Sequence, residues 1–504
     1  ITSVQFSPTS GYLIVGDDLL LNVNADGTSY SIGTISINGK SITSITDNGD
    51  NTYTTTYTIA EGDNDIAAAA TVPISVTLLD AAGNESAAFI TSPTAGTTPT
   101  IDAHSPTLSS ITTALGATYA KLGDTFNITV LSDEAVSLSG GASLNLYLNS
   151  GTSISLTTAT QITNIVFPYT VQVDDETTSL SVDSITVSGG SLTDIAGNDV
   201  ILTLPTGANI EDNEVIIVDG IIPYNFSITS ITQDGTYSTT GYYNSGDNGL
   251  SFEVALDNTD GSLTNGTLQL QGRFASEATY TNIGDATSIT NINGQTLTLD
   301  NATIAAHVGY FENVYMRYLV KVTDVAGNAE NSAISADSML IDKTVPSSFS
   351  ILDVTPIGGN AVDGILNATN SSIDFLVSIP NDATLSSGTI QMEFRINSGT
   401  WADLSTAQNI TSINTNQGVS IPSADFTGIS DTDSLYFRTT LTDNAGNYAT
   451  SATYETATIV DYGPPAQAQI GDVTTVGGTI VASYWNASNT TLQVLVPIDN
   501  TDAS

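Results

Sequence analysis

The sequence predicts an all-β protein: a tandem array of β-sandwich domains with Greek-key connections that together form an elongated rod. Two short motifs recur in the same order along the 504 residues. Between them lie short stretches of alternating apolar and polar residues, separated by Gly, Asn and Asp turns, and no helical period is long enough to matter. The many Thr and Ile residues also favour strands over helices.

The charge balance excludes several classes of protein. The chain has 52 acidic and 8 basic side chains, a formal net charge of −44, and no cysteine. Without cysteine there is no disulfide framework, zinc finger, iron–sulfur cluster or cysteine nucleophile. So few basic residues cannot form a phosphate-reading surface, and an anionic membrane would repel the chain. Because 40% of the residues are apolar, we expect folded cores rather than disorder, in a salty extracellular setting that screens the self-repulsion.

The repeats divide the chain into units. A linker motif, Ile/Val-Asp-x-x-x-Pro, has aspartates 117, 123 and 119 residues apart (219 − 102, 342 − 219, 461 − 342). A corner motif, Asp-x-Ala-Gly-Asn, begins 22, 25, 18 and 18 residues before each linker Asp (102 − 80, 219 − 194, 342 − 324, 461 − 443). We therefore expect four near-complete domains and the N-terminal part of a fifth, cut from a longer array. These units one to five span residues 1–101, 102–218, 219–341, 342–460 and 461–504.

The units fall into two subtypes. Units one and two (subtype A, with unit two a variant) share a Gly-Asp pair at 16–17 and 123–124, an offset of 107 (123 − 16). Units three to five (subtype B) share an Asn placed 25 residues after the linker Asp (244 − 219, 367 − 342, 486 − 461).

The subtype B units also share a strand pattern. Residues 250–256, 373–379 and 492–498 alternate strictly between apolar and other side chains, which predicts half-buried strands. Arg273 and Arg395 occupy equivalent strand positions further along, and we expect each to pair with a local acid.

Both motifs have a structural explanation. Asp-x-Ala-Gly-Asn fits a hairpin corner, because Asp bonds nearby backbone, Gly adopts positive φ and Asn tolerates left-handed geometry. The linker proline fixes φ and donates no hydrogen bond, which suits a stiff junction between sandwiches.

The motifs also support a resemblance. The segments 79–84, 323–328 and 442–447, each followed by a linker motif, resemble the bacterial immunoglobulin-like repeats. Those repeats fill giant surface adhesins, and related ones occur in prokaryotic surface-layer proteins. Unit two, with its Gly-Asp pair and segment 193–198, resembles a neighbouring version. The resemblance covers essentially the whole chain and implies immunoglobulin-like sandwiches, but it says less about biological role, because function resides in sites.

The resemblance further implies calcium as a cofactor, since members of such families often bind it at domain junctions. Calcium takes roughly six to eight oxygen ligands. We expect each linker Asp to form a site with the corner Asp of the preceding unit. The alternative is that these residues only cap turns, and no Asp-x-Asp-x-Asp-Gly loop occurs at the linkers. The candidate ligands are Asp80, Asp102, Asp194, Asp219, Asp324, Asp342, Asp443 and Asp461.

Asn-x-Ser/Thr sequons are candidate glycosylation sites, provided that the source organism glycosylates its surface proteins. In a chain rich in these residues, many sequons arise from composition alone. They start at Asn84, Asn127, Asn225, Asn265, Asn301, Asn367, Asn370, Asn409, Asn486 and Asn489.

No pattern favours an enzyme. His104 and His307 belong to different units, so no shared triad or metal constellation follows. The acidic pairs at 133–134 and 174–175 have the composition of glycosidase carboxylates, but turn acids are the usual explanation.

The expected function is a non-enzymatic repeat region of a large extracellular cell-surface protein, acting as an adhesin stalk or spacer. The alternative is a self-assembling surface-layer, sheath or filament subunit whose partners are its own copies or neighbouring surface proteins. Mixed subtypes favour that alternative somewhat, because stalks often repeat one module faithfully. A weaker alternative is a carbohydrate-binding module array for surface glycans. The aromatic pairs at 242–243 and 484–485 offer faces for sugars, but aliphatic residues at 365–366 favour core or junction packing there.

Overall fold

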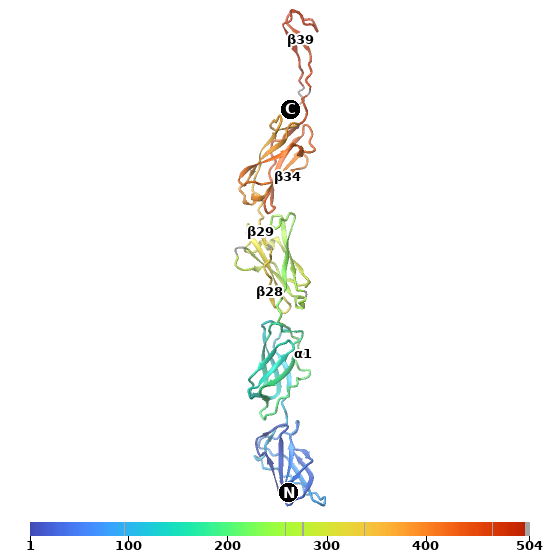
Figure 1. Ribbon diagram of the computed structural model, residues 1–504, viewed down its shortest axis with the longest axis vertical. Coiled ribbons are helices and arrows are strands. Elements are labelled where there is room, and N and C mark those ends of the chain that lie inside the picture. Colours follow the sequence, from blue (N-terminus) through green and yellow to red (C-terminus); the bar gives the residue numbers. More distant parts are fainter. Residues whose placement is uncertain (95, 258, 275–276, 337, 466, 499–504) are drawn as a thin grey trace.

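The chain folds into four β-sandwiches and a terminal hairpin, arranged end to end (Figure 1). The computed structural model describes residues 1–504 apart from 95, 258, 275–276, 337, 466 and 499–504. Almost all regular structure in the described part is β, which confirms the predicted fold class. None of the helices found in those residues is long and apolar enough to cross a membrane.

Unit one has two sheets around one core, with strand orders β1-β3-β7-β6 and β5-β4-β8, and a separate parallel pair, β2-β9. The strands are β1 (Ser3–Ser7), β2 (Tyr12–Leu13), β3 (Asp18–Asn24), β4 (Ser31–Ile37), β5 (Lys40–Ile42), β6 (Thr46–Asp47), β7 (Thr52–Thr58), β8 (Ile74–Leu79) and β9 (Thr100–Ile101).

Unit two has the same plan, with strand orders β10-β12-β15, β14-β13-β17 and β11-β19-β16, and with β18 also paired to β12. The strands are β10 (Leu108–Thr113), β11 (Tyr119–Lys121), β12 (Thr125–Ser139), β13 (Ser143–Leu148), β14 (Ser153–Leu156), β15 (Ile162–Thr170), β16 (Glu176–Thr177), β17 (Val182–Ser188), β18 (Ser191–Thr193) and β19 (Ile217–Asp219). One short helix, α1 (Ile210–Asn213), lies between β18 and β19.

Unit three places the sheet β20-β22-β26 against the sheet β21-β29-β27-β23-β24, on which β25 pairs with β23 and β28 with β27. The strands are β20 (Ser227–Gly235), β21 (Tyr242–Tyr243), β22 (Asp247–Ala255), β23 (Thr267–Phe274), β24 (Thr281–Asn282), β25 (Thr287–Ser288), β26 (Gln295–Asp300), β27 (Tyr315–Thr323), β28 (Ala329–Asn331) and β29 (Met339–Ile341). The helices are η1 (Gly261–Leu263) and α2 (Asn301–Ala305).

Unit four repeats this plan with β30-β32-β35 against β31-β38-β36-β33-β34, and β37 pairs with β36. The strands are β30 (Ile351–Ile357), β31 (Ile365–Asn367), β32 (Ser372–Ile379), β33 (Thr389–Ile396), β34 (Ala402–Asn409), β35 (Thr415–Pro422), β36 (Ser434–Thr442), β37 (Tyr448–Thr450) and β38 (Thr458–Asp461). The helices are η2 (Ala383–Ser387) and η3 (Ser423–Asp425).

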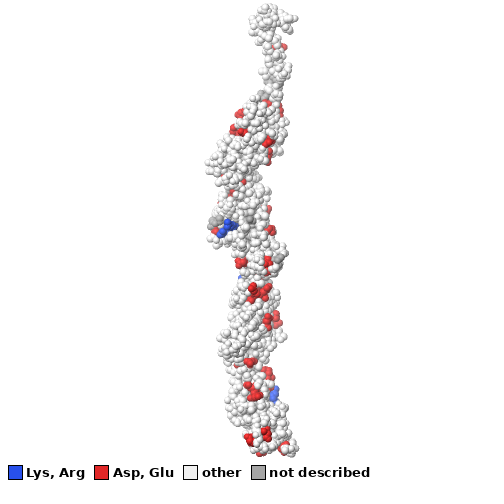
Figure 2. Space-filling model, viewed as in Figure 1, with Lys and Arg blue, Asp and Glu red and all other residues white. Residues whose placement is uncertain are grey.

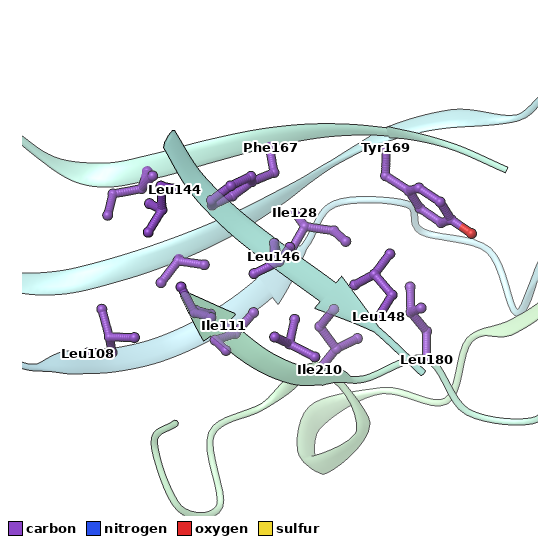
Figure 3. Packing of buried hydrophobic residues seen from close by; sticks show 14 of the residues in the cluster. Leu108, Ile111, Ile128, Leu144, Leu146, Leu148, Phe167, Tyr169, Leu180 and Ile210 are labelled. Carbon is purple, nitrogen blue, oxygen red and sulfur yellow. The ribbon is translucent and has the colours of Figure 1, made fainter. Parts of the chain in front are cut away.

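Each sandwich has its own hydrophobic core. Four separate clusters of buried side chains run from Phe6 to Ala103, Leu108 to Val218, Tyr243 to Ile341, and Ile351 to Val460. Figure 3 shows the second cluster, where leucine and isoleucine side chains from several strands meet Phe167 and Tyr169. Because no cluster draws on two units, apart from the linker residue Ala103 in the first, the units adhere to one another through other contacts.

The predicted alternating strands form, but only two are half-buried. In β22, Leu250, Phe252 and Val254 are at most 2% exposed, as expected, and β32 shows the same alternation. Unit five is described as a hairpin of β39 (Val473–Val476) and β40 (Thr491–Val494). Leu492 in β40 is 53% exposed, because no other strand in the described residues covers this hairpin.

The expectation that Arg273 and Arg395 pair with acids is wrong. Neither guanidinium forms an ion pair with any residue that the structure describes. Arg273 instead lies over the ring of Tyr280 at 5.0 Å, and Arg395 lies 5.1 Å from each of the rings of Trp401 and Tyr436. The partners of these arginines are aromatic rings and not carboxylates, and the position of an arginine on a strand does not predict which of the two it contacts.

One pairing recurs in all four sandwiches. The short second strand runs parallel to the last strand: β2 with β9, β11 with β19, β21 with β29 and β31 with β38. The last strand ends at or just before the linker Asp. The turn after the second strand therefore lies beside the linker Asp at the end of the sandwich that faces the next unit.

Candidate functional site at the junctions between units

The corner motif is held by its own side chains. In all four corners one carboxylate oxygen of the Asp accepts the backbone N–H of the Asn at 2.8–2.9 Å, and the other accepts the Asn side-chain amide at 2.9–3.0 Å. The intervening glycine has positive φ, for example +98° at Gly327 and +90° at Gly446, which a side chain would disfavour. The corner thus fixes the orientation of the Asn amide before any contact with another unit.

In three corners this amide bridges two units. Its oxygen accepts a backbone N–H from the turn after the second strand of the preceding unit, and its nitrogen donates to the carbonyl oxygen of the linker Asp. Asn198 joins Val15 (3.1 Å) and Asp102 (3.3 Å); Asn328 joins Leu122 (3.0 Å) and Asp219 (3.0 Å); Asn447 joins Ser245 (2.8 Å) and Asp342 (2.9 Å). The same bridge, formed three times, docks each corner onto the unit before it.

Further bonds add to individual junctions. Lys121 Nζ donates to the carbonyl of Gly327 at 3.3 Å, and the amide of Asn244 donates to the carbonyl of Ala445 at 2.7 Å. Asn244 is one of the three asparagines shared by the subtype B units, and it is fully buried at the junction. Its role is therefore to contact the following unit as well as to shape its own turn.

The corner of unit one provides an internal comparison. Asp80 and Asn84 make the same bonds within the corner, but Asn84 is exposed. By contrast, Asn198, Asn328 and Asn447 are at most 4% exposed. Burial of the corner is therefore a result of docking and not of the corner fold itself.

Docking brings three acids together at each junction. They are the linker Asp, the corner Asp of the following unit and a third acid of that following unit. We name these sets the junction acids: Asp102, Asp194 and Glu134; Asp219, Asp324 and Asp260; Asp342, Asp443 and Asp382. In the first set, one carboxylate oxygen from each residue lies within 4.8 Å of the others.

The electrostatics of these sets are unfavourable without a cation. Burial, together with the charges of Asp324 and Asp260, raises the pKa of Asp219 to about 6. Burial likewise raises the pKa of Asp342 to about 6, with a contribution from Asp443. Among the described residues, no junction acid forms an ion pair. Buried carboxylates without a counter-charge are the environment that a cation stabilises.

The pairing of aspartates differs from the one expected from sequence. Asp102, Asp219 and Asp342 lie beside the corner Asp of the following unit, not of the preceding unit, because the corner docks backwards along the chain. Asp80 meets no other unit in the described residues, and Asp461 lies at the free end of β38.

The junction acids offer the oxygen ligands that calcium takes, and within the described residues only the first set brings all three carboxylates within 4.8 Å of one another. All candidate ligands are hard oxygens, and carbonyls of the linker aspartates lie beside them. At the second junction, Oδ2 of Asp260 is buried and has no hydrogen-bond partner, while one oxygen of Asp219 accepts the N–H of Ile221. A buried carboxylate oxygen that has no partner among the described residues, and whose charge acts on Asp219 and Asp324, is free to coordinate a cation.

Sequence reasoning missed the third acid of each set. Glu134 was interpreted as a turn acid, whereas it lies in β12 and its pKa is raised by burial and by Asp102 and Asp194. Asp260 and Asp382 cap η1 and η2 at equivalent places, 41 and 40 residues after their linker aspartates (260 − 219, 382 − 342). That spacing was a usable signal.

The sequons differ in accessibility. Asn370 and Asn489 are 6% and 8% exposed, and their amides donate to the carbonyls of Gly358 and Gly477. Asn367 and Asn486 are partly buried, with their amides also bonded to backbone. The exposed sequon asparagines are Asn84, Asn127, Asn225, Asn265, Asn301 and Asn409.

Comparisons with known proteins give little beyond the fold. No protein-family model matches the chain, and no curated protein matches it. Among solved structures, a crystal structure of the chicken CNTN1 FN1–FN3 domains is similar, with 10% sequence identity and a TM-score of 0.27, covering 71% of this chain and 99% of that one. A likeness this distant says nothing about the activity of the chain.

Proposed function

We propose that the chain is a non-enzymatic stalk or spacer within a large extracellular cell-surface protein of the kind that bacterial immunoglobulin-like repeats build. Its mechanism is mechanical. Independent sandwiches provide length, and docked corners limit bending between them. Copies of the chain or neighbouring surface proteins are its expected partners.

The observation that carries this proposal is the repeated asparagine bridge. Each bridge contributes one hydrogen bond to the preceding unit and one to the linker Asp, in addition to those within the corner. A flexible tether of separate domains has no need for a bridge of constant geometry. Three equivalent bridges instead support a function that depends on a defined distance between the two ends.

We also propose that calcium binds the junction acids. Bound there, it would neutralise the three carboxylates and hold the linker Asp to the two other acids of its set. Docking and calcium binding would then be coupled, because the complete ligand set exists only in the docked state.

Small-angle X-ray scattering tests whether the asparagine bridges make the rod stiff. The triple variant Asn198→Ala, Asn328→Ala, Asn447→Ala keeps every core and removes the three bridges, so its radius of gyration should fall and its scattering should become that of flexibly linked domains. Asn84→Ala, in the same motif but without a junction, is the matched control. An unchanged scattering curve for the triple variant would refute the bridge as the source of stiffness. A regular filament or lattice of the native chain by electron microscopy would instead indicate the assembly subunit.

Calorimetry in the presence of calcium and of a chelator tests whether calcium binds the junction acids. Calcium should raise the melting temperature of the native chain, and the double variant Asp219→Asn, Asp324→Asn should lose part of that response while gaining stability in chelator, since its repulsion is removed. Asp183→Asn, an exposed carboxylate on β17, is the control. Equal melting curves with and without calcium would disprove the calcium proposal and leave the rod proposal standing.

A further inference from the structure

Unit three contains a cavity lined by basic and hydroxyl side chains. It has a volume of about 470 Å³ and is lined by Arg273, Tyr315, Arg317 and Ser338. That volume falls in the range of small-ligand sites, roughly 300 to 1,000 Å³. Figure 2 shows basic side chains on unit three and a smaller basic patch on unit one, in a surface that is mostly white with scattered red.

The two arginines face each other without an acid. Arg273 on β23 is the direct cross-strand partner of Arg317 on β27. Neither guanidinium donates a hydrogen bond or forms an ion pair with any described residue, and Nε of Arg273 is buried and unpartnered. Like charges opposite each other destabilise a sheet, so this pair costs stability as it stands.

Unit four shows how the same position is satisfied elsewhere. Arg395, the equivalent of Arg273, faces Tyr436 rather than a second arginine, and it lies between aromatic rings. The other arginine of that sheet, Arg438, is neutralised by Glu393 at 2.6 Å. Nε of Arg395 is also unpartnered, so the feature that is particular to unit three is the second guanidinium without a carboxylate.

The chain has only 8 basic residues against 52 acidic ones, and surface carboxylates are abundant. Two adjacent arginines that form no ion pair within the described part of such a chain are therefore available to bind an external anion. Paired guanidinium groups match the geometry of a planar carboxylate or a sulfate and form charge-assisted hydrogen bonds with it. The rim of the cavity adds Tyr315, which is 50% exposed and offers a ring face, and the hydroxyl of Ser338.

We propose that this cavity, the Arg273–Arg317 site, binds the carboxylate or sulfate group of an acidic sugar. The guanidinium groups hold the oxyanion, while Tyr315 packs against the sugar ring and Ser338 bonds a ring hydroxyl. Unit three would then be a ligand-binding module within the rod. The proposal is independent of whether the chain serves as a stalk.

Isothermal titration calorimetry of the full chain at low ionic strength tests the site, with glucuronate, glucose 6-sulfate, inorganic sulfate and uncharged glucose as probes. Glucuronate or glucose 6-sulfate should bind, and Arg317→Gln should weaken that binding about tenfold or more. Arg317 is exposed, so the variant should fold. Lys321→Gln removes the same charge from the same strand without touching the cavity, and it should bind like the native chain.

Four outcomes would overturn the proposal. Equal binding by Arg317→Gln and the native chain would exclude the arginine pair, and no heat with either acidic sugar would exclude the ligand class. Inorganic sulfate bound as tightly as glucose 6-sulfate would exclude recognition of the sugar. If the native chain instead self-associates at low salt and Arg317→Gln abolishes this without any sugar binding, the occupant is a carboxylate of a second copy.

Discussion

At the scale of single residues, a tyrosine and a carboxylate shape the subtype A sandwiches. Tyr57 donates its hydroxyl to Asp63 at 2.6 Å, and Tyr169 donates to Asp175 at 2.6 Å. Burial, and next the bond to Asp63, raise the pKa of Tyr57 to about 12. The sequences Tyr-Thr-Ile at 57–59 and Tyr-Thr-Val at 169–171 match, but they do not reveal the partners of the tyrosines, since the acidic turns at 61–63 and 174–176 differ in sequence.

Removing this hydroxyl should destabilise unit two. Asp175 is 3% exposed and accepts bonds from Tyr169, from the N–H of Gln172 and from Thr152, so Tyr169→Phe leaves a buried carboxylate short of one donor. We expect a loss of about 1–3 kcal/mol in the free energy of unfolding of that unit, measured by urea denaturation. Tyr147→Phe, whose side chain is 42% exposed, should change it by less than about 0.5 kcal/mol. A loss of the same size in both variants would show that the bond to Asp175 is not responsible.

At the scale of elements, the corner glycine allows positive φ in the turn and close approach to the preceding unit, and these two effects can be separated. Gly83 and Gly446 both have positive φ, at +84° and +90°. A Cβ at Gly83 would meet nothing within 4 Å, whereas one at Gly446 would collide with Thr239 of unit three. Gly83→Ala should therefore cost only the backbone strain, about 1–2 kcal/mol. Gly446→Ala should cost that amount and also undock unit four from unit three.

Limited proteolysis at linker 342–346, together with scattering, distinguishes the two effects. Only Gly446→Ala should accelerate cleavage there and add flexibility. Equal behaviour of the two alanine variants would mean that the corner does not need close approach to the neighbouring unit.

The same elements show how far the sequence predicts the site. The corner geometry followed from Asp, Gly and Asn preferences, because those are local. The direction of docking did not follow, since it depends on the parallel pairing that sets the turn after β11 beside Asp219, and a short strand such as β11 carries almost no sequence signal. The spacing of Asp260 after its linker Asp marked it as a repeated residue, but its proximity to Asp219 was not predictable for the same reason, because only the assembled junction brings the two together.

At the scale of the whole molecule, the net charge of −44 affects the stiffness of the rod more through the junction acids than through the acids on the surfaces of the sandwiches. Acids spread along a rod repel weakly once salt screens them. The junction acids instead lie close together, with the corner aspartates and two of the linker aspartates buried, so their repulsion opposes docking at three places at once. The stiffness of the rod is therefore tied to anything that neutralises them, whether a cation or a proton.

Protonation gives a prediction with a definite sign. Burial raises the pKa of Asp219 and Asp342 in the docked state from 3.8 to about 6. Between about pH 4 and pH 6 the docked state therefore binds more protons than the undocked state, so docking strengthens as the pH falls through about 6 and gains nothing more below about 4. In chelator, scattering should thus show a stiffer native chain at pH 5 than at pH 7.5, and its units should melt at a higher temperature. The free energy of docking should become more favourable by an amount on the order of 1–3 kcal/mol per carboxyl.

Acidification also lowers the overall net charge, so the decisive quantity is the difference between the native chain and the variant Asp219→Asn, Asp342→Asn, in which both groups are permanently neutral. That variant should be stiff at both pH values, whereas Asp80→Asn, at a corner without a junction, should respond like the native chain. If the double variant kept the full pH response, buried junction carboxylates would not be what controls docking.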